Sequence, residues 1–209
     1  NGKQNKFEIP NMTNPAYVAR VDYSGVKNTR FGISAYYTPS TAKNSTKPSR
    51  MEGIKGAITI LSADAQYYSR DIIARANVIY GNLTESDLIY KENLRNPTAL
   101  GYSETPVAKD VLTYGAEVGY NIGAFFNHKF NLFPFVRYEY YNSMHKTANN
   151  ISADPRYKVD LITAGLNYYI LPNLVAKADY ARRWIGGGRF NNESTISLGL
   201  AYIGWFFSK

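Results

Sequence analysis

Apolar and polar side chains alternate along this chain with a period of two, and no other feature limits its possible folds as strongly. From Ser194 to Phe206, for example, Ile196, Leu198 and Leu200 alternate with small or polar residues. A period of two places successive side chains on opposite faces of a β-strand. The same alternation predicts an all-β chain with nine strands, at about 14–23, 28–38, 54–68, 71–82, 110–122, 132–141, 157–170, 174–184 and 194–206.

The two faces of these predicted strands differ as they do in transmembrane β-strands. One face is rich in small and aliphatic residues, and its rows repeatedly end in tyrosine, of which the chain has 19. Tyrosine suits a membrane–water interface because its ring is apolar and its hydroxyl is polar. The other face carries charges at strand centres. This pattern favours an antiparallel transmembrane β-barrel over a soluble β-sandwich, which stays open as an alternative.

Several function classes find no support in the sequence. No apolar run reaches the roughly 18 residues of a transmembrane helix, and the absence of cysteine excludes disulfides and thiolate metal sites. The two histidines, His128 and His145, fall in connections at opposite ends of the predicted sheet, so no serine–histidine pair is expected. Glycines 186–188 lack the Lys-Ser/Thr of a phosphate-binding loop. We therefore expect no enzyme, cofactor, metal or nucleic-acid partner.

The connections between the predicted strands alternate in length. With the last strand ending in the periplasm, all the clearly long connections fall on the opposite, outer side: 39–53, 83–109, 142–156 and the intermediate 185–193. Outer-membrane barrels have short periplasmic turns and longer extracellular loops. The loop lengths therefore predict a location in the bacterial outer membrane.

The predicted number of strands is odd, whereas single-chain bacterial barrels have even numbers. The polar opening from Asn1 to Asn14 has the character of a loop entered in mid-protein. We therefore expect residues 1–209 to be the C-terminal portion of a single outer-membrane β-barrel domain. A complete eight-stranded barrel is the alternative.

Several motifs occur in a recognisable order: NPAYVARVDY at 14–23, FGISAYY at 31–37, YGAEVGYN at 114–121, LFPFVRYEY at 132–140, LITAGLNYY at 161–169, PNLVAKADY at 172–180 and LGLAYIGWF at 198–206. Together they resemble the C-terminal half of the phosphate-selective porin O and P family of Bacteroidetes-type bacteria. The resemblance implies a 16- or 18-stranded porin, trimeric, that passes phosphate-like anions. The anion-selecting positions of that family are not matched one by one.

Charged residues on the polar parity of the strands are the candidate pore lining, because such charges set ion selectivity. They are Arg20, Arg30, Arg75, Arg137, Lys177, Arg183, Asp64, Glu117, Glu139 and Asp179. Arg20, Arg30 and Arg75 have fewer acidic neighbours in the sequence and are the better candidates for anion selection. Arg137 with Glu139, and Lys177 with Asp179, are open to another interpretation, as ion pairs that stiffen the wall.

The predicted function is passive diffusion of small anions or polar solutes through an outer-membrane porin. The alternative is a plugged barrel that serves as a structural or accessory subunit of an outer-membrane complex. Expected partners are small anionic solutes, outer-membrane lipid, lipopolysaccharide docked by basic loops, and further subunits in a homotrimer or a complex.

Overall fold

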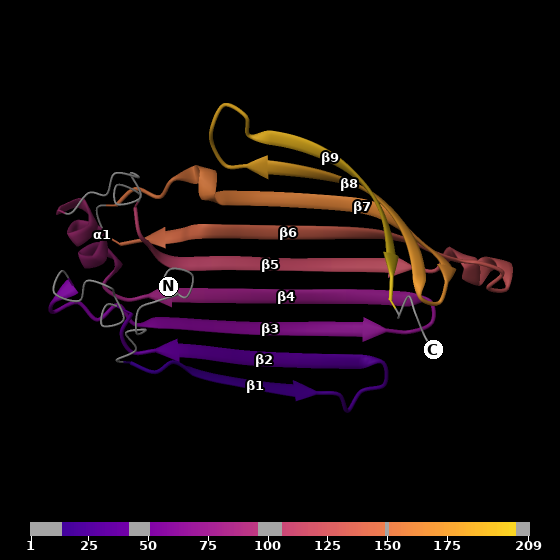
Figure 1. The fold of residues 1–209 in the computed structure, drawn as a ribbon, viewed down its shortest axis with the longest axis horizontal. Coiled ribbons are helices and arrows are strands. Elements are labelled where there is room, and N and C mark those ends of the chain that lie inside the picture. The colour runs from indigo at the N-terminus through magenta and orange to yellow at the C-terminus, as the bar shows by residue number, and fades with distance from the viewer. Residues whose placement is uncertain (1–13, 42–50, 96–105, 149–150, 204–209) are drawn as a thin grey trace, which may run out of the picture.

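The computed structural model describes residues 14–41, 51–95, 106–148 and 151–203 of the chain. Nine strands form one antiparallel sheet in which each strand pairs with its neighbours in the sequence (Figure 1). All nine predicted strands are confirmed, with ends shifted by a few residues. They are β1 (Tyr17–Tyr23), β2 (Thr29–Thr38), β3 (Ile58–Tyr68), β4 (Ile72–Leu83), β5 (Ala108–Tyr120), β6 (Asn131–Thr147), β7 (Lys158–Leu171), β8 (Leu174–Ile185) and β9 (Asn192–Tyr202).

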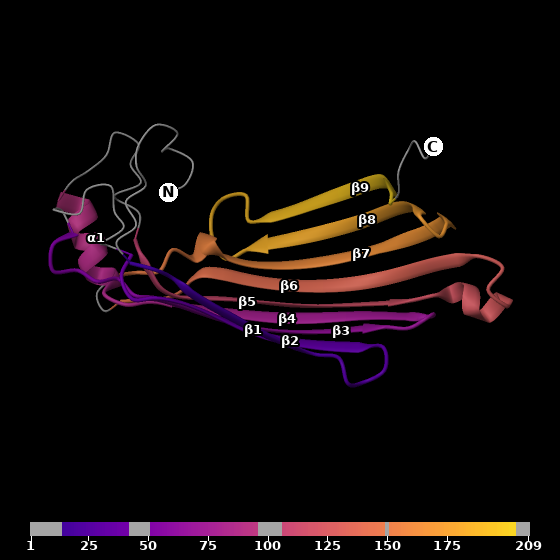
Figure 2. The ribbon, with the colours of Figure 1, turned by 60° about the horizontal axis from the view of Figure 1, so that its bottom comes forward.

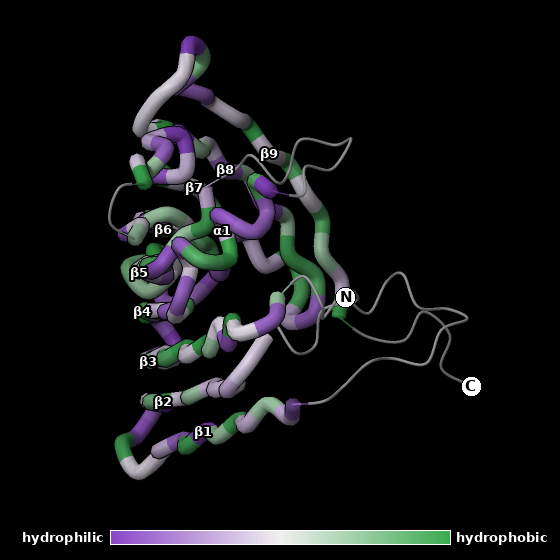
Figure 3. Tube along the Cα trace, turned by 90° about the vertical axis from the view of Figure 1, so that its left-hand side faces the viewer, coloured by the Kyte–Doolittle hydropathy of each residue, from purple (hydrophilic) through white to green (hydrophobic). Residues whose placement is uncertain are grey.

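The sheet is curved but not closed. Seen along the strands, it forms an open arc from β1 to β9 (Figure 3), and within the described residues no pairing joins these two edge strands. The prediction of a barrel is thus confirmed only as far as a nine-stranded antiparallel meander. Because every neighbouring pair is antiparallel, β1 and β9 run in the same direction. Pairing these two edges with each other would therefore be parallel.

The connections alternate between the two ends of the sheet. The connections that hold helix α1 (Ser86–Arg95) and the short helix η5 (Pro155–Tyr157) lie at one end, and η4 (Ile122–Phe126) lies at the other (Figure 1). We call these the long-connection end and the short-connection end. The sequence predicted only a loop at 83–109, whereas the structure forms α1 within it. No described helix is both long and apolar enough to cross a membrane.

Helix α1 forms at the long-connection end because its sequence lacks the alternation of a strand and carries ion pairs at helical spacing. Lys91 lies 3.5 Å from Asp87, and Arg95 lies 3.3 Å from Glu92. These i,i+4 and i,i+3 pairs lie on adjacent turns of one helical surface and support the helix. Figures 2 and 3 show α1 on the side toward which the sheet curls.

Strand β6 is longer than predicted. It was expected to end at residue 141 but continues to Thr147, where register shifts in its pairing with β5 mark a β-bulge or a similar irregularity. The placement of His145 in a connection is therefore wrong, since it lies within β6. Residues 1–13 of the expected loop from Asn1 to Asn14 lie outside the described residues, as does the end of the last predicted strand from residue 204.

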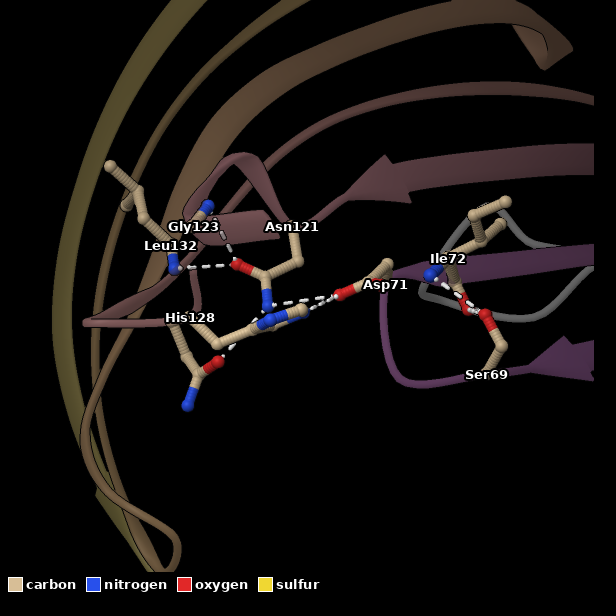
Figure 4. Close-up of polar contacts among 8 residues, drawn as sticks. Ser69, Asp71, Ile72, Asn121, Gly123, His128 and Leu132 are labelled. Atoms are coloured by element: carbon tan, nitrogen blue, oxygen red, sulfur yellow. Dashed lines mark hydrogen bonds and ion pairs between the residues drawn. The ribbon is translucent and has the colours of Figure 1, made fainter. Parts of the chain in front are cut away.

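The short-connection end is held by polar contacts around Asn121, whose side chain is fully buried (Figure 4). Its Oδ1 accepts hydrogen bonds from the backbone N–H groups of Gly123 (3.0 Å) and Leu132 (3.2 Å). Its Nδ2 donates to Asn131 Oδ1 at 3.0 Å and to Asp71 Oδ1 at 3.5 Å. One amide therefore ties the end of β5 to the start of β6 and to the turn between β3 and β4.

Candidate functional site

The two faces of the sheet have opposite chemistry. Residues paired directly across antiparallel strands share a face, and the register runs through Asp64, Asn77, Gly115 and Glu139 without a break. All the predicted pore-lining residues lie on this side, which we call the charged face: Arg20, Arg30, Arg75, Arg137, Lys177, Arg183, Asp64, Glu117, Glu139 and Asp179. The opposite side, which holds Ile33, is the apolar face.

Burial on the two faces is the reverse of that in a soluble sheet. Along β7, Val159 and Thr163 of the charged face are buried, whereas Ile162, Ala164 and Leu166 of the apolar face are exposed. This contrast is expected when the charged face is the concave side of the curved sheet, where side chains converge. Across the described residues, only a few apolar side chains are buried: Phe133, Met144, Val159 and Val175.

The apolar face is bordered by aromatic side chains at both ends of the strands. On β1, Tyr17 and Tyr23 are six positions apart, which corresponds to about 20 Å along a strand. The residues toward the long-connection end are Tyr17, Tyr37 and Tyr80, whereas Tyr114, Tyr138, Tyr140 and Tyr180 lie near the middle of β5, β6 and β8. Those toward the short-connection end are Tyr23, Phe31, Tyr67, Tyr120, Tyr168 and Tyr202. Small and aliphatic residues fill the zone between these two bands.

Arg20 is held on the charged face by two carboxylates. Its guanidinium donates to Asp22 at 2.7 and 2.9 Å, and its Nη1 lies 2.9 Å from Asp64 of β3. The sequence selected Arg20 as a candidate for anion selection because it has few acidic neighbours along the chain. Asp64 lies 44 positions away, and the pairing of β1 with β2 and of β2 with β3 brings it close.

A second group of charges crosses β4, β5 and β6. Glu117 accepts a hydrogen bond from Arg137 Nε at 2.9 Å and lies 3.8 Å from Arg75 Nη1. Arg137 also lies 3.6 Å from Glu139, as the ion-pair interpretation expected. These charges surround a hollow of about 210 Å³ whose floor includes Gly115. Because Gly115 has no side chain, it leaves space between Asn77 and Glu139, its partners in the register.

Three cations on the charged face, Arg30, Arg75 and Lys177, are held by fewer or longer ion pairs than Arg20 and Arg137. In the described part of the chain, Arg30 and Lys177 make no ion pair, and the predicted pair of Lys177 with Asp179 is not formed. Arg75 is 52% exposed and rests over the ring of Tyr68 at 5.3 Å. Arg30 and Arg75 flank Gln66 in the register, so two strand spacings, about 10 Å, separate their backbones.

Glu193 is a charged residue of this face that was not predicted from the sequence. Glu193 lies opposite Arg183 in the register and forms an ion pair with it. The last strand was predicted to begin at residue 194, two positions after its start at Asn192. Glu193 is two positions before Thr195 and four before Ser197, so the alternation of β9 places it on the same face. The sequence alone could therefore have identified it.

One pair of charges lies beyond the strands at the long-connection end. Asp154, the N-cap residue of η5, accepts hydrogen bonds from the side chain of Arg156, at 2.6 to 3.0 Å, and from the Arg156 backbone N–H at 2.9 Å. The guanidinium and then the N–H stabilise the ionised carboxylate, so they lower the pKa of Asp154. The pair fixes the entry into β7.

Among the described residues, no group of three or more metal-ligating side chains could hold an ion. His128 pairs with Asp71 at 2.8 Å in the Asn121 cluster at the short-connection end. No model of a known protein family matches the chain, and no curated protein matches it significantly in sequence. The resemblance to phosphate-selective porins thus stays a prediction.

Proposed function

We propose that the sheet forms part of the wall of an outer-membrane β-barrel whose charged face lines an aqueous pore for small anions. The observation that carries this proposal is the reversed burial of the two faces. Ile33 and Leu198 are 61% and 82% exposed on the apolar face, whereas the Glu117 side chain is only 17% exposed on the charged face. Soluble proteins rarely expose such large continuous apolar surfaces. A barrel in lipid has apolar side chains outside and polar ones inside.

The two aromatic bands support the same orientation. Transmembrane barrels carry girdles of aromatic residues at both interfaces, on either side of an apolar band about 25 Å tall. Tyr17 and Tyr23 are about 20 Å apart along β1, which corresponds to about 15 Å of height for a strand tilted by about 40°. The support therefore comes from the aromatic residues on both sides of the apolar zone and not from their spacing. The long-connection end, with α1 and η5, is then the outer side.

The proposed barrel includes strands beyond the nine described here. Because β1 and β9 run in the same direction, antiparallel closure requires an odd number of further strands between them. Seven would give 16 strands and nine would give 18, the sizes that the family resemblance implies. Within the described residues, neither edge strand pairs with a second neighbour, so both edges present backbone groups that further strands would pair with. A homotrimer of such barrels completes this proposal.

Arg30, Arg75 and Lys177 are the side chains that we expect to favour anions. Cations that line a pore replace part of the hydration of a passing anion and lower its barrier. Arg30 and Arg75 present two guanidinium groups on either side of Gln66, and guanidinium groups suit phosphate oxygens. Phosphate-like solutes are therefore the proposed cargo. No covalent step is needed.

A plugged barrel that serves as a structural or accessory subunit of an outer-membrane complex is the second candidate. The ion pairs on the charged face favour it, because they neutralise charges that an open selective pore would use. Arg20 is compensated by Asp22 and Asp64, and Arg137 by Glu117 and Glu139.

Reconstitution of the purified protein into planar lipid bilayers under a salt gradient separates these functions. Steady single-channel current with a reversal potential on the anion side supports the pore. Folded protein that stays electrically silent favours the plugged barrel. Recovery of a monodisperse protein from buffer without detergent would contradict the membrane location altogether.

A further inference from the structure

Charged side chains are confined to one end of the apolar face. Among the described strands they are Asp110, Lys146, Lys158, Asp160 and Arg182, all toward the long-connection end. Asp110 accepts a hydrogen bond from Asn82 at 2.6 Å and lies 3.9 Å from Lys146. Asp110 and Lys146 are thus both engaged with protein partners.

Asp160 accepts a hydrogen bond from the Tyr138 hydroxyl at 2.6 Å. Lys158 and Arg182 are exposed, and in the described part of the chain neither of them forms an ion pair. Two exposed cations therefore lie at the border of the apolar surface. The nearby carboxylate of Asp160 is hydrogen-bonded to Tyr138 and does not pair with either of them.

The β8–β9 hairpin adds a repeated arrangement of arginine and aromatic side chains. The Arg182 guanidinium lies over the Trp184 ring at 5.4 Å, and Arg189, in the connection, lies over Phe190 at 5.5 Å. Arg182 Nε also donates to Asn192 Oδ1 at 3.2 Å. Stacking and this bond orient the Arg182 guanidinium and leave its Nη groups available as donors.

Apolar surface adjoins these cations directly. Phe190 is 78% exposed, and Ile196 of β9, two positions beyond Ser194, is 77% exposed. A soluble anion would use the cations alone, whereas an amphiphile with an anionic head would cover both kinds of surface. Tryptophan and arginine at the border of an apolar band are typical anchors at the membrane interface.

We propose that Lys158, Arg182 and Trp184 at this end of the apolar face, together with Arg189 and Phe190 of the adjoining β8–β9 connection, bind the phosphate-bearing headgroup of an outer-leaflet lipid. The phosphate oxygens accept hydrogen bonds from the Arg182 and Arg189 guanidinium groups, and Lys158 adds charge. The acyl chains cover Ile196 and the apolar residues beyond it. The inference rests on the proposed membrane orientation, since only that orientation brings outer-leaflet lipid to this face.

The test is native mass spectrometry of the full chain in detergent, titrated with lipid A as the phosphorylated probe. Phosphatidylcholine and inorganic phosphate are the comparison probes. We expect lipid A to be retained more strongly than phosphatidylcholine, and inorganic phosphate not to displace it at matched concentration. Equal retention of both lipids, or displacement by inorganic phosphate, would overturn the proposal.

Arg182→Gln and Arg189→Gln test the named residues. Each is expected to weaken lipid A retention by roughly fivefold, the effect of one cation near an anionic surface. Arg183→Gln is the matched control, because Arg183 is the next residue but lies on the opposite face with Glu193. Unchanged retention in the first two variants, or equal loss in the control, would contradict the assignment.

Two further measurements separate a loss of lipid binding from misfolding of the variants and from failure of the pore proposal. Heat-dependent migration in gels reports whether each variant is folded, and Arg182→Lys, which keeps the charge, should recover part of the retention in a folded protein. Conductance of the same preparations in bilayers without lipid A tests the pore separately. A silent protein that still retains lipid A contradicts the pore, and a conducting protein that does not retain it contradicts this inference.

Discussion

Arg182 and Arg183 are consecutive residues of β8, yet their guanidinium groups lie on opposite faces of the sheet. Arg183 pairs with Glu193 on the charged face, and Arg182 stacks on Trp184 on the apolar face. The pleat of the strand produces this separation, and a register slip of one residue would exchange the two environments. The pairing of β8 with β9 therefore determines which arginine lies on the charged face and which on the apolar face. In the proposed barrel these are the pore side and the lipid side.

Leu198 and Ser197 give the most direct test of the orientation of the sheet. Leu198→Arg places a charge on the apolar face, and we expect it to lower the free energy of unfolding by about 2–4 kcal/mol in lipid vesicles. Ser197→Arg lies opposite Asp179 on the charged face and should cost far less. Equilibrium urea unfolding measures both, and the reverse order of effects would contradict the proposed faces.

Arg30→Gln and Arg75→Gln should each reduce the anion-over-cation permeability ratio severalfold. A unit charge at 4 Å in water changes the energy of an ion by about 1 kcal/mol, which corresponds to a factor of this size. Reversal potentials in a salt gradient provide the measurement. Arg70→Gln is the control, since this exposed arginine lies in the turn between β3 and β4. A ratio that stays constant in both pore variants would exclude these residues from selection.

Asn121→Ala should destabilise the protein by about 3 kcal/mol, because it leaves buried backbone N–H groups of Gly123 and Leu132 without a partner. Ser69→Ala serves as the comparison. Its hydroxyl accepts one hydrogen bond, from the Ile72 N–H at 2.9 Å, at the same end of the sheet (Figure 4). Denaturant unfolding should show a loss of less than about 1.5 kcal/mol for Ser69→Ala. Similar losses in the two variants would argue against a special role for Asn121.

The Asp154–Arg156 pair should make η5 sensitive to acid. The folded-state pKa of Asp154 is below its ordinary value of about 3.9 because Arg156 stabilises the carboxylate. The pair therefore contributes fully above that ordinary value, and its contribution is lost as the pH falls through the lowered folded pKa. A carbon-detected NMR titration of Asp154 should give a midpoint below 3.9. In Arg156→Gln the midpoint should return toward 3.9, and an unchanged midpoint would refute the cause.

The alternation of side chains was sufficient to predict all nine strands, because the pleat imposes that period locally. It was not sufficient to predict contacts across strands. Arg20 has Asp22 as its near acidic neighbour in the sequence, but Asp64, 44 residues away, also compensates it once β1, β2 and β3 pair. Lys177 and Asp179 share a face as expected and still make no ion pair. Which charges meet depends on side-chain conformations that the alternation does not determine.

The strand ends were also difficult to predict. Beyond residue 141 the irregular pairing of β6 breaks the simple parity, so the pattern seemed to stop where the strand in fact continues to Thr147. At β9 the polar residues Asn192 and Glu193 resembled a loop, although Glu193 completes a row on the charged face. Helix α1 was missed because its segment, 83–109, was predicted as a loop only from the lack of strand alternation. The ion-pair spacing that supports a helix there was not considered.

The parallel direction of the two edge strands restricts how such a sequence can change in evolution. Insertion of one strand would move every connection that follows it in the sequence to the other end of the sheet. A strand inserted before α1 or η5 would move that helix as well. Duplication of a β-hairpin adds two strands and leaves every connection on its original side. Sequences that share this architecture are therefore expected to differ in size by whole hairpins, and their charged and apolar faces keep their parity through each step.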